Sequence, residues 1–91
     1  MDHERLPGGR LIDEGLADLV KGIESVPALL VSIGAPRLTR LGLVLPRPPV
    51  AEPEHRLYLE LCRTDPDSAH SRYNALIRTL VSFERAAGCA R

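Results

Sequence analysis

The sequence is short of aromatic residues, cysteine and net charge. It contains no tryptophan, two tyrosines, one phenylalanine and two cysteines among 91 residues. Its 12 acidic and 12 basic residues cancel, which argues against a chain that coats nucleic acid or anionic lipid along its whole length. The few aromatic residues provide no platform on which bases could stack. Cys62 and Cys89 form no disulfide framework, so we expect two reduced thiols in the cytoplasm.

Long apolar runs are also missing. The longest, residues 28–31, is far shorter than a membrane span, so we predict no membrane association. Residues 1–9 mix both charges and include proline and two glycines. They do not resemble a signal peptide, and we predict a flexible N-terminus and a cytoplasmic protein.

The motifs of common enzyme and cofactor-binding classes are absent. There is no phosphate-binding loop of the GxxxxGK type and no serine in a nucleophile elbow. The three histidines, His3, His55 and His70, are scattered and lack the paired Cys or His spacing of a zinc site. We therefore predict no metal site and no cofactor.

Helical periodicity extends over most of the chain. With 44% hydrophobic and 26% charged residues, the sequence is typical of a single globular domain over 1–91. Apolar residues spaced four, three and four apart predict a first helix over 10–24, with Ile12, Leu16, Leu19 and Ile23 on one face.

A second helix is predicted to begin after Ser25, which can act as its cap, and to end at Gly34. A very short third helix is expected from there to Gly42. Four prolines follow in 45–53, which predicts a stiff, extended connector. The segment 43–45 also fits a strand, and this alternative stays open.

The next helix is predicted to open at residues 52–54, where two glutamates flank a proline. Alternating leucines in 57–61 also fit a strand. Residues 65–67 (Asp, Pro, Asp) predict the start of a last helix, which runs to about Ala87 and stops at Gly88. The sequence therefore predicts an all-α fold of four to five helices with a long C-terminal helix.

The last helix carries the clearest apolar stripe. Its members, Ala69, Tyr73, Leu76, Leu80, Phe83 and Ala87, alternate between spacings of four and three residues. The stripe is explained either by the core of one domain or by contact with a second copy. We predict a homodimer through residues 54–87, with Tyr73, Leu76, Leu80 and Phe83 at the interface.

Positive charge is concentrated in the middle of the chain, where residues 34–50 hold three arginines and no acid. There, Ile33, Gly34, Arg37 and Arg40 lie in a segment, 31–41, that resembles a helix-hairpin-helix element. The resemblance implies that backbone amides of the hairpin and a basic residue contact a DNA phosphate. Ser32 stands where that family has its first glycine.

Two further patterns suggest contact with nucleic acid. Residues 54–87 also fit a helix-turn-helix, with Arg72, Asn74 and Arg78 on the second helix. Arg63 and His70, with six residues between them, resemble the motif of HEPN ribonucleases. That resemblance implies proton transfer by the histidine and phosphate binding by the arginine.

Taken together, the patterns favour a non-enzymatic cytoplasmic helical protein that acts in protein–protein association, with a protein partner or with itself. Nucleic-acid binding through 31–41 is the first alternative, and a small ribonuclease is the second.

Overall fold

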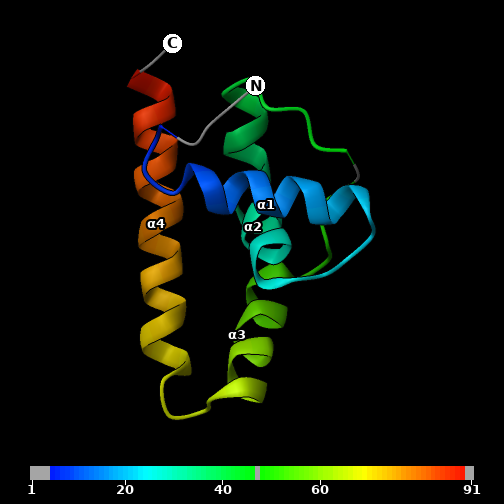
Figure 1. Cartoon of the computed structure of the whole chain (residues 1–91), viewed down its shortest axis with the longest axis vertical. Coiled ribbons are helices and arrows are strands. Elements are labelled where there is room, and N and C mark those ends of the chain that lie inside the picture. The colour runs from blue at the N-terminus through cyan, green and yellow to red at the C-terminus, as the bar shows by residue number, and fades with distance from the viewer. Residues whose placement is uncertain (1–4, 47, 90–91) are drawn as a thin grey trace.

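Four helices make up the computed structural model of this protein, which describes residues 5–46 and 48–89 (Figure 1). The helices are α1 (Gly9–Val20), α2 (Val26–Arg40), α3 (Pro53–Thr64) and α4 (Ala69–Cys89). No residue in the described ranges forms a β-strand, which confirms the predicted all-α class. Of the two strand alternatives, 43–45 is an irregular loop and 57–61 lies inside α3.

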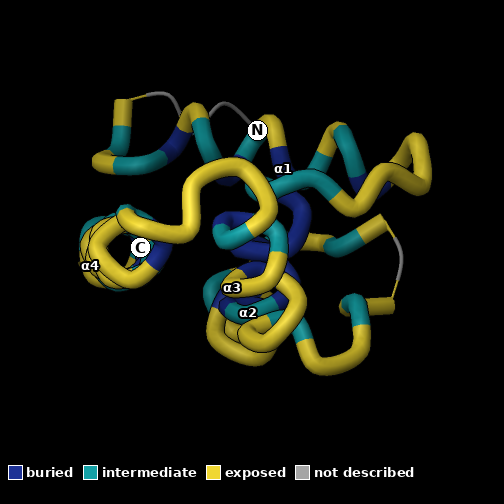
Figure 2. The backbone as a smooth tube through the Cα atoms, turned by 90° about the horizontal axis from the view of Figure 1, so that it is seen from below, coloured by how far each residue is buried: buried dark blue, intermediate teal, exposed yellow. Residues whose placement is uncertain are grey.

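The helix α2 lies at the centre, and the other three helices all pack against it. In Figure 1, α4 runs along one side of the molecule, α1 crosses α2, and α3 continues below the beginning of α2. The view along the long axis in Figure 2 shows the buried residues where the helices face one another. The long C-terminal helix therefore flanks the domain, whereas α2 forms its centre.

The first helix ends earlier than predicted. Gly22 adopts the left-handed conformation (φ 75°). The next N–H, that of Ile23, bonds back to the carbonyl oxygen of Asp18 at 2.9 Å, which is the Schellman arrangement. The chain therefore leaves the helix after Val20, and the prediction of a helix up to residue 24 is wrong. The cause is a glycine that reaches a backbone conformation most residues avoid.

The predicted start of α2 after Ser25 is confirmed, and α2 ends just before Gly42, which the sequence predicts as the stop of a separate short helix. Ser25 precedes the helix, and its Oγ accepts a hydrogen bond from the N–H of Ala28 at 3.2 Å. At the other end, Gly42 (φ 99°) lets the N–H of Leu43 bond to the carbonyl oxygen of Leu38 at 3.1 Å. Both signals act through local hydrogen bonds and are therefore visible in the sequence.

The predicted break at Gly34 is wrong, because α2 continues through Gly34 and Pro36 to Arg40. A glycine and a proline inside a helix together disfavour it by about 4 kcal/mol. Here the helix is buried on several sides at once, with Leu30, Val31 and Leu38 completely inaccessible. Burial of such side chains contributes about 1.5 to 3 kcal/mol each, which outweighs the local penalty.

The connector between α2 and α3 is anchored to the core along part of its length. Of the predicted connector 45–53, Leu45 and Val50 pack against the hydrophobic core. The N–H of Val50 donates to Ser32 Oγ at 3.1 Å. Pro53 belongs to α3 as its first residue, where the missing N–H costs no hydrogen bond.

The last helix begins later than predicted. Asp65 does not cap it, because its carboxylate accepts a 2.8 Å hydrogen bond from the hydroxyl of Ser68 within a tight turn. The carbonyl of Ser68 then accepts the first helical hydrogen bond from Arg72 N at 2.9 Å. At its other end α4 extends through Gly88, which the sequence predicts as its stop.

One hydrophobic cluster joins all four helices. Its members are Ile12, Leu19, Ala28, Leu29, Leu30, Val31, Leu38, Leu57, Leu61, Ala69, Leu80 and Phe83. Leu6, in the segment 1–9 predicted to be flexible, packs against this cluster, while residues 1–4 lie outside the described residues. Both cysteines are free thiols. Within 5–46 and 48–89, no helix combines the length and the apolar character needed to cross a bilayer.

Candidate functional site

The hairpin expected within 31–41 is not formed. Gly34 is a buried residue in the interior of α2, and Ile33 is partly buried beside it. Amides inside an α-helix donate to carbonyls four residues earlier, so they are not available to a phosphate. The helix-hairpin-helix prediction therefore loses its backbone anion site, and only its two arginines remain as candidate contacts.

Gly34 instead allows α4 to approach α2 closely. A Cβ at this position would lie 2.8 Å from Leu80 Cδ1 and 3.2 Å from Glu84 Oε2. The first distance is shorter than real Cβ atoms show, so a side chain here would displace the end of the Leu80 side chain and crowd the Glu84 carboxylate. The absence of a side chain at Gly34 leaves room for the carboxylate of Glu84 between α2 and α4.

Three arginines line a hollow together with this carboxylate. Arg37 and Arg40 lie in the last turn of α2, and Arg85 lies on α4. With Leu41 and Glu84 they line a hollow of about 310 Å³. A second hollow of about 350 Å³ adjoins it and shares Arg37 and Glu84 with it. We call the two hollows together the arginine groove.

Glu84 is the most unusual residue of the arginine groove. Its side chain is only 8% exposed, whereas the Arg37 side chain, which approaches it to 3.6 Å, is 72% exposed. Burial raises the pKa of Glu84 above its ordinary value, and the charge of Arg37 partly offsets this. A buried carboxylate that pairs with a guanidinium largely in water is held by a weak interaction.

Sequence reasoning does not identify Glu84 or Arg85 as site residues. A signal exists for Glu84, because it follows Leu80 by four residues and therefore lies on the apolar side of α4. An acid in a stripe of buried leucines and phenylalanine indicates a paired or functional carboxylate. No comparable signal in the sequence predicts that Arg85 lines the same hollow as Arg37 and Arg40, because this depends on how α2 and α4 pack.

The two residues of the HEPN-like motif are each engaged elsewhere. The guanidinium of Arg63 binds the carboxylate of Glu60 through two hydrogen bonds, of 2.6 and 2.8 Å. The ring of His70 lies 3.2 Å from the side-chain amide of Asn74. Arg63 and His70 are both exposed, and neither of these contacts joins one to the other. These contacts do not bring Arg63 and His70 together, and catalysis by the two residues stays a prediction.

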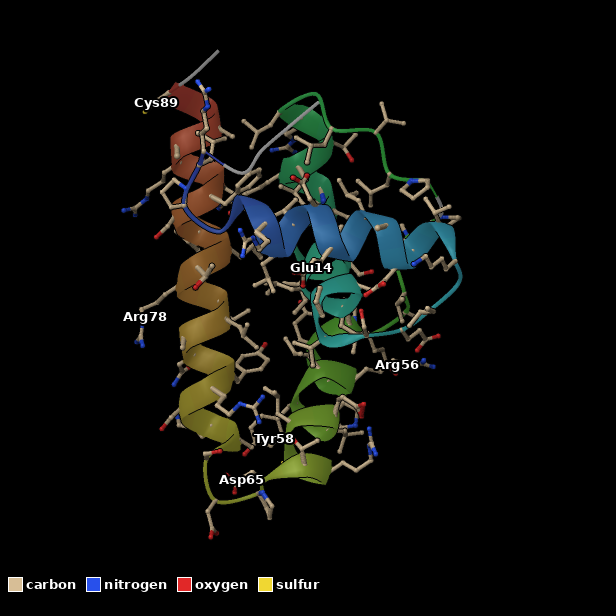
Figure 3. All side chains as sticks on the ribbon, in the orientation of Figure 1. Glu14, Arg56, Tyr58, Asp65, Arg78 and Cys89 are labelled. Carbon is tan, nitrogen blue, oxygen red and sulfur yellow. The ribbon has the colours of Figure 1, made fainter. Side chains whose placement is uncertain are left out.

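The helix-turn-helix candidates Arg72, Asn74 and Arg78 are all exposed on α4. Arg72 donates to the hydroxyl of Thr64 at 3.3 Å, across the turn between α3 and α4. Arg78 points away from the rest of the fold (Figure 3). These side chains are accessible to solvent. Contact between them and the bases of a nucleic acid stays a prediction.

The apolar stripe of α4 mostly faces its own domain. Phe83 is completely inaccessible and Leu80 is 4% exposed, so neither can contact a second copy without opening the core. Tyr73 and Leu76 are partly exposed. The ring of Tyr73 packs edge-on against Tyr58 of α3, with 6.0 Å between the ring centres. Burial within one chain already accounts for Leu80 and Phe83, and a dimer interface through them stays a prediction.

A second surface carries exposed apolar groups on the side of α3 that holds Arg56 (Figure 3). Leu59, at 53% exposure, lies among two acids and two arginines over a hollow of about 380 Å³. The lining residues are Glu24, Leu29, Arg56, Leu59, Glu60 and Arg63. We call this surface the Leu59 face. Arg56 bonds to Glu24 of the α1–α2 loop, and Arg63 bonds to Glu60.

Comparisons with protein-family models, with curated proteins and with solved structures give no match for this chain. Across the described residues, no group of three His, Cys, Asp or Glu side chains lies close enough together to hold a metal ion. The candidate sites are therefore the arginine groove and the Leu59 face.

Proposed function

We propose that this protein is a cytoplasmic protein–protein interaction module that self-associates through the Leu59 face. The observation that carries the proposal is Leu59 itself, a large apolar side chain that is 53% exposed in the middle of a helix. Leucine in such a position gains little from its own domain and gains more from burial against a partner. The free thiols of Cys62 and Cys89 suit a reducing compartment.

The charges around Leu59 favour a second copy as the partner. In a twofold dimer the same surface meets itself, so a surface of one charge sign would repel its copy. The Leu59 face carries Glu24 and Glu60 against Arg56 and Arg63, a balance of two acids and two bases. The ion pairs that exist within one chain can be exchanged across the twofold axis without leaving a charge unpaired.

Two more exposed apolar residues come shortly before Glu24 in the chain. Val20 is 60% exposed and Ile23 is 47% exposed. The ion pair between Glu24 and Arg56 ties the loop that contains Ile23 to α3. Exposed apolar side chains in addition to a single leucine add to the area that an interface needs.

The proposal changes the predicted position of the dimer interface. The prediction from sequence covers 54–87 and relies on the stripe of α4. The proposed interface keeps the part of that range that lies in α3 and adds the loop around Glu24.

Light scattering over a range of protein concentrations tests the proposal. The wild-type protein is expected to change from monomer to dimer as concentration rises. Leu59→Glu replaces the apolar centre with a charge on an exposed helical position, so the helix is retained. The loss of about half a leucine side chain from each copy is expected to weaken the dimer by about 100-fold.

Val44→Glu is the matched control, because Val44 is 85% exposed in the loop after α2 and lies outside the Leu59 face. It is expected to leave the dimer unchanged. A mass of one chain at every concentration would refute self-association. A dimer that survives Leu59→Glu would show that a different surface is used.

A further inference from the structure

The arginine groove is a second binding surface, on other residues than the Leu59 face. We propose that it binds an acidic, amphipathic segment of a partner protein. The carboxylates of that segment would bind Arg37, Arg40 and Arg85, and an apolar side chain would fill the adjoining hollow. This proposal does not rest on self-association, because the two surfaces share no lining residue.

The arginines provide the charge complementarity. The first hollow is lined by three arginines and one acid, so arginine side chains outnumber carboxylates in its lining. They come from two helices, so the hollow is a concave site with donors on opposite walls. Guanidinium groups bind carboxylates through paired hydrogen bonds, which makes an acidic side chain the natural ligand.

The adjoining hollow provides the apolar part of the site. Its walls include Ile33 and Pro36 on α2 and Ile77 and Val81 on α4. Ile33, Ile77 and Val81 are only partly buried by their own domain, and Pro36 is exposed. A ligand that fits both hollows has a carboxylate next to an aliphatic side chain. An amphipathic protein segment has this composition.

Three features favour a protein segment over nucleic acid. The buried carboxylate of Glu84 lies in the floor of the groove and repels a continuous polyanion. Arg37 and Arg40 are in the last turn of α2, where the helix dipole is negative and opposes dense phosphate charge. Aliphatic walls offer nothing to a sugar–phosphate backbone, which binds through hydrogen bonds and charge.

Binding in the groove is coupled to the protonation of Glu84. An incoming carboxylate competes for Arg37, the residue of α2 that pairs with Glu84. Arg40 of α2 and Arg85 of α4 line the same hollow. When Arg37 turns to the ligand, Glu84 stays buried without its ion pair. A buried, unpaired carboxylate takes up a proton from solvent, so affinity rises as pH falls.

Fluorescence anisotropy with a defined peptide tests the proposal. The probe is a fluorescein-labelled peptide of glutamate and leucine arranged as an amphipathic helix. Matched probes carry lysine in place of glutamate or serine in place of leucine, and a short double-stranded DNA is the fourth ligand. The glutamate–leucine peptide is expected to bind most tightly, because it alone satisfies both hollows.

Variants locate the binding site. The double variant Arg37→Gln with Arg40→Gln is expected to weaken peptide binding by about tenfold or more. The double variant Arg72→Gln with Arg78→Gln is the matched control, because it also removes two arginine charges, from exposed residues of α4 outside the groove. Glu84→Gln is expected to tighten binding several-fold and to abolish the rise in affinity as pH falls. Circular dichroism of each variant confirms that the helices are retained.

Several outcomes would overturn the proposal. The first is that no peptide binds to the wild-type protein. The second is that the lysine peptide binds as tightly as the glutamate–leucine peptide. The third is that the control variant loses as much peptide affinity as the double variant of Arg37 and Arg40. Tighter binding of DNA than of peptide, lost in the double variant, would assign the groove to nucleic acid instead. Leu59→Glu is expected to leave peptide affinity unchanged, so failure of the dimer and failure of the groove are separate results.

Discussion

Gly15 of α1 lies directly against the backbone of Pro27 in the first turn of α2, with no space for a side chain between the two helices. A Cβ on Gly15 would lie 2.8 Å from the carbonyl carbon of Pro27 and 2.5 Å from Val31 Cγ2. This contact sets how closely α1 crosses the central helix. Where α4 meets α2, Gly34 likewise lies close to the other helix, but there its nearest neighbours are the side chains of Leu80 and Glu84 rather than backbone atoms.

Gly15→Ala is therefore expected to destabilise the protein. The added methyl group meets backbone atoms, which cannot rotate away, so α1 must shift outward at a cost of about 2 to 3 kcal/mol. Gly88→Ala is the control, since its Cβ would find Leu41 Cδ2 at an ordinary 3.7 Å. Gly88→Ala is expected to be neutral or to stabilise by up to about 1 kcal/mol. Urea unfolding followed by circular dichroism measures both, and equal effects would contradict the close crossing.

Phe83 distinguishes a core role from an interface role for the stripe of α4. Because its side chain is fully buried within one chain, Phe83→Ala is expected to lower the free energy of unfolding by about 3 to 4 kcal/mol. The loss should be the same at low and high protein concentration. Val44→Ala, at an 85% exposed position, is expected to change it by less than about 0.5 kcal/mol. A loss for Phe83→Ala that appears only where the protein dimerises would restore the interface interpretation.

Glu84 makes stability depend on pH in a defined direction. Because burial raises its pKa in the folded state, the folded protein holds this proton more tightly than the unfolded chain does. The stabilising contribution of this proton is present below the ordinary pKa of 4.5 and is lost as pH rises through the raised value. Above that value the ionised, buried carboxylate weakens the fold.

Glu84→Gln is therefore expected to stabilise the protein near pH 7 by roughly 1 kcal/mol. The exposed guanidinium of Arg37 stays solvated in this variant, so no buried charge is left behind. The advantage should shrink toward pH 4. Glu14→Gln, at an exposed residue of α1 (Figure 3), is the control and is expected to change stability near pH 7 by less than about 0.5 kcal/mol. Denaturant unfolding at a series of pH values gives the comparison, and a destabilised Glu84→Gln at neutral pH would contradict the argument.

The candidate sites follow from the sequence only in part. The basic character of 34–50 drew attention to Arg37 and Arg40, and the structure brings both to one hollow. The reason given by the helix-hairpin-helix resemblance does not hold, because the hairpin is absent. Arg85 comes from a different helix, and Glu84 reaches Arg37 only because Gly34 lets α4 approach α2.

The Leu59 face also follows from the sequence only in part. Leu59 belongs to an alternation of leucines, 57–61, that fits a strand as well as a helix. In the helix, Leu57 and Leu61 turn inward and Leu59 is left outside. Glu24 joins this surface through its ion pair with Arg56, a contact between segments far apart in the chain.

The sequence by itself determined the all-α class, the cap of α2 at Ser25, its end at Gly42 and the apolar side of α4. Each of these depends on interactions within a few residues, such as an i,i+4 stripe, a side-chain cap or a glycine with positive φ. Only the tertiary structure decided that α2 runs unbroken through Gly34 and Pro36. The burial of a central helix on several sides provides more free energy than a glycine and a proline remove, and no local pattern records which helices surround it.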